Sequence, residues 1–317
     1  MTSLSNVVRQ LDEVPVEPSV VTIGVFDGVH RGHQVIIGRA VREAQERGVR
    51  SVAVTFDPHP TAVVRPDMAP PLLQRLDDRV TTLALAGVDL VLVLPFTQEL
   101  AQLDPTEFVK RVIAGRLAAV KVIVGTNFRF GHKAAGDIAT LADLGTSYGY
   151  DTEAVSILHL GDTALSSSQL RRRIEQGDVA WAAAALGRPW RHVGEVVRGE
   201  GRGRTIGVPT ANVVAPAGLV ALGGGVYVAH ARCGEKRWDA VVNVGTRPTF
   251  DGTTTTVEAH LLDVEGALDI YGATLELSLL DRLRDEQRFD GVEALVAQIH
   301  TDIAAAREML ARRTAAR

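Results

Sequence analysis

Two histidines flank a glycine where an apolar segment gives way to a helical pattern. The segment reads Ile-Gly-Val-Phe-Asp-Gly-Val-His-Arg-Gly-His and places His30 and His33 close together, just before the helical pattern that begins near Gln34. Unpaired amides at a helix start carry partial positive charge, and imidazoles add hydrogen bonds to anionic oxygens. The spacing predicts a binding site for a phosphate chain. The competing interpretation is a strand–turn–helix with a capping aspartate and two surface histidines.

Three further segments of the N-terminal half combine residue types suited to a nucleotide site. Phe56–Pro60 is a proline-fixed loop with one histidine, and Gly125–Gly131 offers an amide, a cation and two aromatic rings on which a flat ligand could stack. Leu165–Arg171 opens a helix with three serines and an arginine, which suit a polyphosphate. Taken singly, each segment also fits an ordinary turn, a glycine-bounded loop or a helix cap.

The C-terminal half contains a second group of this kind. Arg198–Asn212 is rich in glycine and arginine, as phosphate loops are, but it lacks the Gly-Lys-Ser/Thr of a Walker loop and fits a basic hairpin equally well. Thr210 and Asn212 alternate onto one face of a strand, where both oxygens can bind Mg²⁺. Glu258 lies in an alternating segment with Thr256 and His260 on its face; it is either a solvated strand residue or a general base.

The elements that must position these groups differ between the two halves. Up to about Leu186, strand-like runs alternate with helical patterns, which predicts a parallel sheet in an α/β fold with the motifs at the carboxyl ends of its strands. The expected strands are Val20–Ile23, Ser51–Phe56, Leu90–Leu94, Lys121–Val124 and Glu153–Ile157, and the expected helices are Gln34–Arg47, Asp77–Ala86 and Pro105–Leu117.

Beyond Leu186, alternation of period two predicts a mainly antiparallel sheet, closed as a small barrel, and a terminal helix. The expected strands are Val193–Val197, Val226–Ala231, Ala240–Val244, Thr254–Leu262 and Thr274–Leu280. We therefore expect two domains, residues 1–186 and 187–317.

Composition narrows the class of protein. The chain has 317 residues, of which 46% are hydrophobic and 23% charged. Its net charge of −4 shows no excess of positive charge of the kind that binds nucleic acid. Its single cysteine, Cys233, excludes an internal disulfide and a cysteine metal cluster and suits the cytoplasm. The apolar runs are too short for a membrane span, and self-association stays open.

The N-terminal motifs, in their order, resemble the FMN adenylyltransferase module of bacterial bifunctional FAD synthetases, which joins FMN to ATP and releases pyrophosphate. Thr126 and Ser168 are mild departures from the usual pattern of that module. The resemblance implies ATP contacts from Gly24, Phe26, Asp27, His30, His33, Asn127, Ser167, Ser168 and Arg171. It implies a flavin pocket near Pro58, His59, Pro60, Phe128 and Asp137.

The C-terminal motifs resemble the riboflavin kinase domain. They are Pro209–Asn212, Asn243–Phe250, Thr256–Glu258 and Tyr271–Arg284. The resemblance covers Arg191 to about Leu310 and implies a six-stranded barrel, Mg²⁺ on Thr210 and Asn212, and Glu258 as the base toward the riboflavin 5′-hydroxyl. It implies phosphate contacts from Gly199, Gly201, Gly203, Arg204, Gly207, Thr210 and Asn212.

The whole sequence predicts a cytoplasmic enzyme that makes FMN from riboflavin and ATP, and FAD from FMN and ATP, with Mg²⁺. One alternative is a transferase for another phosphorylated acceptor, with the barrel as a lid. Another is a flavin-binding or flavin-sensing protein without turnover.

Overall fold

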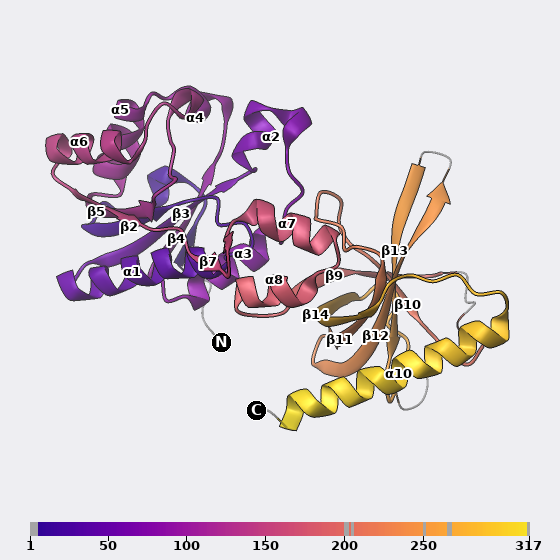
Figure 1. Ribbon diagram of the computed structural model, residues 1–317. Coiled ribbons are helices and arrows are strands. Elements are labelled where there is room, and N and C mark those ends of the chain that lie inside the picture. Colours follow the sequence, from indigo (N-terminus) through magenta and orange to yellow (C-terminus); the bar gives the residue numbers. More distant parts are fainter. Residues whose placement is uncertain (1–5, 200–202, 204–205, 250–251, 265–267, 316–317) are drawn as a thin grey trace. The chain divides into compact units, whose positions relative to one another are not determined.

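A computed structural model of the chain describes residues 6–199, 203, 206–249, 252–264 and 268–315. The chain forms two compact units, Met1–Ser167 and Ser168–Arg317 (Figure 1). The contacts between residues therefore divide the chain after Ser167, so the two helices that precede the barrel (Ser167–Glu175 and Val179–Leu186) group with the second unit. We expected the domain boundary after these helices, at Leu186. Independent folding of residues 187–317 stays a prediction.

The first unit is built on a six-stranded parallel sheet in the order β1-β4-β3-β2-β5-β6. Every residue of β2 is buried, which explains its uninterrupted apolar character. The strands are β1 (Val7–Val8), β2 (Ser19–Ile23), β3 (Arg50–Asp57), β4 (Leu90–Pro95), β5 (Ala119–Gly125) and β6 (Asp151–Val155). The five expected strands are confirmed, and the short edge strand β1 is an addition.

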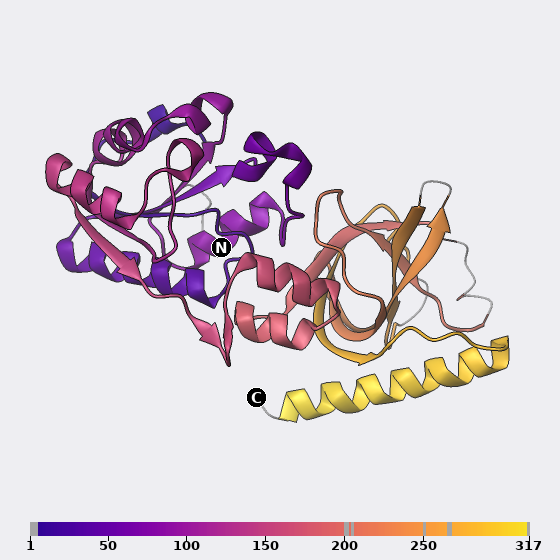
Figure 2. The same cartoon turned by 45° about the horizontal axis from the view of Figure 1, so that its top comes forward.

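Helices cover both faces of this sheet, as Figures 1 and 2 show. Residues of α1 and α3 pack on one face, around Ile37 and Leu83. Residues of α5, of the π-helix η4 (Val109–Arg116) and of α6 pack on the other face, around Ile113 and Leu141. The α-helices are α1 (Arg31–Arg47), α2 (Pro60–Val64), α3 (Leu76–Leu85), α4 (Gln98–Gln102), α5 (Pro105–Phe108) and α6 (Ile138–Tyr148). The shorter elements are η2 (Leu11–Glu13), η3 (Pro66–Met68), η5 (His132–Ala134) and the β7–β8 hairpin (His159–Leu160, Thr163–Ala164).

The helix expected over Pro105–Leu117 differs in form. It begins at Pro105 behind the capping side chain of Asp104, but continues from Val109 to Arg116 as a π-helix, η4. A π-helix widens the backbone spiral, so periodicity in the sequence does not reveal it.

The second unit contains a closed six-stranded antiparallel barrel in the order β10-β13-β12-β11-β14-β9, as expected. Its strands are β9 (Trp190–Val197), β10 (Ala211–Val214), β11 (Gly225–Cys233), β12 (Lys236–Thr249), β13 (Gly252–Leu261) and β14 (Thr274–Arg284). Two helices precede the barrel, α7 (Ser167–Glu175) and α8 (Val179–Leu186), and α10 (Val292–Ala315) closes the chain.

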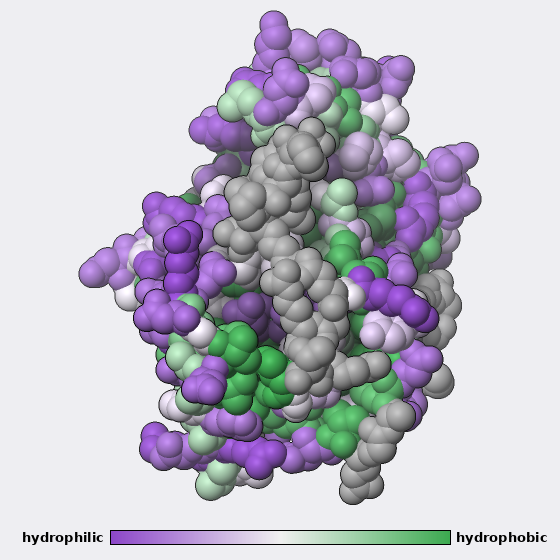
Figure 3. Space-filling model, turned by 90° about the vertical axis from the view of Figure 1, so that its right-hand side faces the viewer, coloured by the Kyte–Doolittle hydropathy of each residue, from purple (hydrophilic) through white to green (hydrophobic). Residues whose placement is uncertain are grey.

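The helix α10 runs along the outside of the barrel (Figure 1). Ala306 and Leu310 of this helix pack against outward-facing strand residues such as Val228 and Val241. The face turned to the viewer in Figure 3 carries hydrophobic residues among mostly hydrophilic ones. No helix within the described residues combines the length and the apolar character needed to cross a membrane.

Candidate active sites

His30 and His33 lie together at the start of α1. His30 is the N-cap residue, and its Nδ1 accepts a hydrogen bond from the His33 backbone N–H at 3.3 Å. The two rings stack, with 3.6 Å between their centroids. A Cβ at Gly32 would lie 3.1 Å from the His30 ring, so glycine lets the rings pack against the backbone. The helix begins at Arg31 rather than near Gln34, because the imidazole of His30 provides the cap.

Burial keeps both imidazoles neutral. It lowers the pKa of His30 to about 4, and burial, followed by the neighbouring His30, holds the pKa of His33 well below its usual range. Because Nδ1 of His30 accepts a hydrogen bond, its proton resides on Nε2, which can donate to a ligand oxygen. His33 Nδ1 is buried and has no hydrogen-bond partner among the described residues. His30 is 5% exposed, which excludes a pair of surface histidines.

The loop between β2 and α1 is held by its own side chains. Phe26 and Val29 have φ angles of 52° and 40°, which are uncommon for residues with a side chain. The Phe26 ring is buried against Gly24 and meets His33 edge-on, with ring centroids 5.3 Å apart. The Asp27 carboxylate accepts from the Leu73 backbone N–H at 3.0 Å. The side chains of Phe26 and Asp27 therefore fix the loop, and the backbone of this loop is the part that can face a phosphate.

Two other predicted segments contact this region. The Ser167 hydroxyl, at the start of α7, donates to the Asp27 carbonyl at 2.9 Å. A Cβ at Gly125 would lie 3.1 Å from Asn127 Oδ1 and 3.4 Å from Ile36 of α1, so Asn127 lies beside the helix that His30 caps. Strands β3, β2 and β5 are neighbours in the sheet, which explains why their following loops meet at one edge.

The flavin-pocket predictions fall on residues that also have structural roles. His59 caps α2 by accepting from the Thr61 N–H at 3.1 Å, between Pro58 and Pro60. Asp137 caps α6, and hydrogen bonds from Thr140 hold the pKa of its carboxyl below the usual range.

The two aromatic rings of the Gly125–Gly131 loop are not both available to a ligand. Phe128 is partly exposed, but Phe130 is buried in the core beside Phe108. Only Phe128 can offer a face for stacking. Ser168 and Arg171, the remaining predicted phosphate contacts, occupy α7, where Arg171 is buried.

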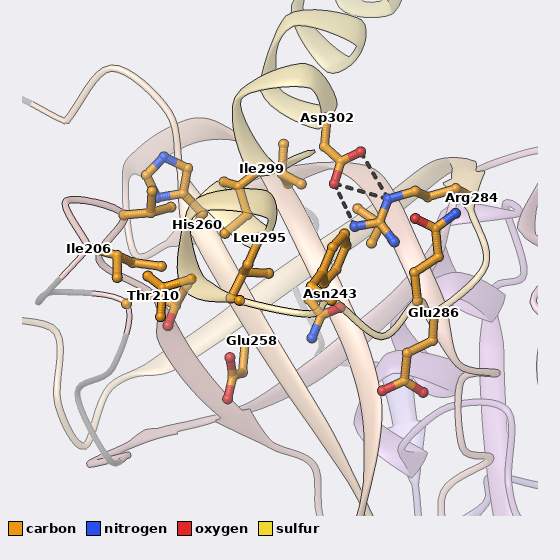
Figure 4. A pocket seen from close by; sticks show the side chains of 18 of the residues that line it. Ile206, Thr210, Asn243, Glu258, His260, Arg284, Glu286, Leu295, Ile299 and Asp302 are labelled. Carbon is orange, nitrogen blue, oxygen red and sulfur yellow. Dashed lines mark hydrogen bonds and ion pairs between the residues drawn. The ribbon is translucent and has the colours of Figure 1, made fainter. Parts of the chain in front are cut away.

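A second site lies on the outer surface of the barrel. Asn212 of β10 pairs with Glu258 of β13, which pairs with Asn243 of β12, so the three side chains form one row across three strands. Figure 4 shows Glu258 and Asn243 beside the cavity together with Thr210. No role was expected for Asn243, although its alternation with the buried Val242 and Val244 marks it as outward-facing.

The row borders a cavity of about 640 Å³ between the barrel and α10. One part of its wall is polar, with Thr210, Asn212 and Glu258; the rest combines apolar residues with charged ones such as Arg284, Glu286 and Asp302. The apolar lining includes Val226, Val241, Phe289, Leu295 and Ile299. The α10 wall follows from tertiary packing alone, so sequence periodicity did not reveal it.

A buried ion pair fastens α10 at this cavity. Arg284, at the end of β14, donates from Nη2 to the Asp302 carboxylate at 2.8 Å and from Nε at 3.0 Å (Figure 4). Gln298 donates to the same carboxylate at 2.9 Å. Because two donors of one guanidinium bind the same carboxylate, both side chains are restricted, and the end of β14 is held against α10.

The glycines ahead of β10 allow close approach to the polar end of the cavity. A Cβ at Gly199 would lie 2.2 Å from Asn212 Nδ2, and one at Gly203 would lie 3.3 Å from Thr210 Oγ1 and 2.3 Å from the Val208 carbonyl oxygen. Gly207 has a φ of 79°, which glycine adopts readily. The predicted contacts Gly201 and Arg204 lie outside the described residues.

Comparisons with known proteins match both units. The family described as FAD synthetase matches residues 13–169, and the family described as riboflavin kinase matches residues 186–310. The bifunctional riboflavin kinase/FMN adenylyltransferase of Escherichia coli K12 is 37% identical over 95% of this chain and 96% of its own length. The proteins of the same description from Pseudomonas fluorescens and Bacillus subtilis are 40% and 34% identical, covering 92% and 90% of this chain and 93% and 90% of their own.

A solved structure shares the fold over almost the whole chain. It is described as a macrolide-efflux protein from Streptococcus pneumoniae, is 30% identical, and covers 95% of this chain and 98% of its own with a TM-score of 0.86. Two matched domains in the expected order, together with full-length relatives of one description, establish the relationship. This chain belongs to the family of bifunctional riboflavin kinase/FMN adenylyltransferases.

Proposed function

We infer that the protein phosphorylates riboflavin to FMN and transfers an adenylyl group from ATP to FMN to give FAD. The observation that carries this assignment is the order of the two family domains along one chain. The histidine pair in the first unit and the Asn212–Glu258–Asn243 row in the second support it chemically.

In the kinase reaction, we propose that Glu258 accepts the proton of the riboflavin 5′-hydroxyl. The hydroxyl oxygen then attacks the γ-phosphorus of ATP, and ADP leaves. The apolar part of the cavity suits the flat ring system of a flavin, and the polar part suits the hydroxyl and the phosphates. This division supports an orientation in which the ribityl chain points toward Glu258.

Thr210 and Asn212 provide oxygen donors that fit a magnesium ion. Mg²⁺ prefers oxygen donors and commonly keeps waters and phosphates as its other ligands, so one hydroxyl and one amide oxygen suffice. The absence of a side chain at Gly199 and Gly203 leaves space directly beside these two donors. When bound, Mg²⁺ would offset the negative charge of the phosphates.

In the adenylyl transfer, a phosphate oxygen of FMN attacks the α-phosphorus of ATP and pyrophosphate leaves. The attacking oxygen is already anionic, so no base is required. We propose that the neutral imidazoles of His30 and His33 donate hydrogen bonds to the phosphates, together with the amides at the start of α1. Asn127, Ser167, Ser168 and Arg171 would complete the contacts. Both reactions consume ATP, which supports a cytoplasmic location.

The test is incubation of the purified protein with riboflavin and Mg·ATP, with separation of FMN, FAD, ADP and pyrophosphate over time. FMN should appear first and FAD second. Tight flavin binding without products would favour a sensor, and turnover restricted to another acceptor would favour a different transferase.

Glu258→Gln provides the matched test of the proposed base. It keeps the size and polarity of the side chain but cannot accept the proton, so FMN formation should fall roughly a hundredfold to ten-thousandfold. FAD formation from added FMN should persist, and Mg·ATP binding should survive. Near-normal FMN formation would show that Glu258 is only a solvated strand residue.

A further inference from the structure

The side chain of Arg79 joins two loops of the adenylyl-transfer region. Arg79 lies on α3 and is 2% exposed. Its Nη1 donates to the Val25 carbonyl at 2.9 Å, and its Nη2 donates to the Phe56 carbonyl at 3.0 Å. Val25 belongs to the loop that leads to His30, and Phe56 lies near the end of β3, just before the loop that contains His59. One planar guanidinium therefore sets the distance between these two loops.

Burying the charged guanidinium of Arg79 costs desolvation free energy, so its presence here needs a physical explanation. Burial lowers the pKa of the guanidinium, and the carboxylates of Asp27 and Asp57 oppose that shift. Arginine stays charged even so, because its ordinary pKa lies far above neutrality. An apolar side chain of similar size would fill the space without the desolvation cost. What such a side chain lacks is the fork of donors that reaches two carbonyls at once.

The loop that Arg79 holds is strained. Its φ angles at Phe26 and Val29 are 52° and 40°, and such a backbone persists only when its surroundings determine it. The Thr55 hydroxyl donates to the same Val25 carbonyl at 2.8 Å, and Gln34 Nε2 donates to the Val29 carbonyl at 2.9 Å. These donors keep the Val25 and Val29 carbonyls pointing toward other protein groups.

We propose that Arg79 is a positioning residue for adenylyl transfer. Arg79 contacts no substrate. It fixes the position of the loop that leads to His30 relative to the Phe56–Pro60 segment, and this relative position aligns FMN with the α-phosphorus of ATP. This inference rests on the proposed function. A shift of about 1 Å between reacting groups typically costs on the order of a hundredfold in rate.

The experiment compares Arg79→Met and Arg79→Lys with Arg75→Met, a substitution at the exposed arginine that directly precedes α3. Each variant is measured for single-turnover FAD formation and for the number of ATP and FMN molecules bound at saturation. Arg79→Met should bind both ligands at full stoichiometry but react tenfold to a hundredfold more slowly. Arg79→Lys, which keeps the charge but not the fork, should recover part of the rate. Arg75→Met should match the parent protein.

Several outcomes would overturn the proposal. A purely structural role predicts that rate and binding stoichiometry fall together in Arg79→Met, and an unchanged rate excludes any role. If Arg79→Met fails to fold, Arg79→Lys decides, because it keeps the buried charge but cannot donate to both carbonyls at once. A slower reaction at full stoichiometry then supports loop positioning, and an unchanged rate refutes it. The parent protein reports on the proposed function separately, because absence of FAD there would refute that function and not the role of Arg79.

Discussion

Gly199→Ala should damage the kinase through a single contact. The added Cβ would lie 2.2 Å from Asn212 Nδ2 and 2.7 Å from its Cγ, whereas unbonded heavy atoms of this kind rest about 3.5 Å apart. The amide of Asn212 must therefore move by roughly 1 Å. If Asn212 binds Mg²⁺, a displacement of this size should lower kcat/KM for Mg·ATP about tenfold to a hundredfold, or about 1.4 to 2.7 kcal/mol.

The assay follows FMN formation at varied ATP and Mg²⁺, with FAD formation from added FMN as the internal control. Gly224→Ala is the matched variant, because a Cβ there meets its nearest atoms at an ordinary 3.6 Å. The same substitution in an Asn212→Ala background should cost little, since the group that it displaces is already gone. An equal loss in both backgrounds, or a Gly199→Ala enzyme within twofold of the parent, would refute the reasoning.

Three other expectations follow from the structure. His30→Ala and His33→Ala should each lower FAD formation on the order of a hundredfold while FMN formation changes little, and equal loss of both activities would instead show structural roles. Both His30 and His192 have their pKa lowered to about 4 by burial, so unfolded histidine, with a pKa near 6.5, takes up protons first as the pH falls. The free energy of unfolding, measured by urea titration, should not depend on these groups above about pH 6.5. It should fall between pH 6.5 and 4, by roughly 2 kcal/mol per histidine at pH 5. His30→Gln and His192→Gln should each remove part of this decline, and a flat profile would contradict burial as the cause. A fragment beginning at Ser168 should melt at a higher temperature than one beginning at Gly187, because the Gly223 N–H donates to the Ile174 carbonyl of α7 at 3.0 Å; equal melting temperatures would show that α7 and α8 add nothing to the barrel.

The sequence by itself determined the fold class and the identity of most candidate site residues. Continuous apolar runs such as Val20–Ile23 mark strands buried on both faces, and the alternation around Glu258 marks a strand with one outward face, because side-chain direction repeats with a fixed period in each case. Local spacing also placed His30 and His33 at a helix start, since a cap requires only neighbours in the chain.

Tertiary structure decided which groups meet and in which state of charge. Register between strands brought Asn212, Glu258 and Asn243 into one row, and no local pattern specifies register. Burial made His30 and His33 neutral, and packing sent Phe130 into the core while Phe128 stayed partly exposed. Arg79 looks like any charged residue of an amphipathic helix in the sequence. Only the folded chain places its two donors on carbonyls that lie 54 and 23 positions away, because hydrogen bonds at such separations depend on how the sheet brings its strand ends together.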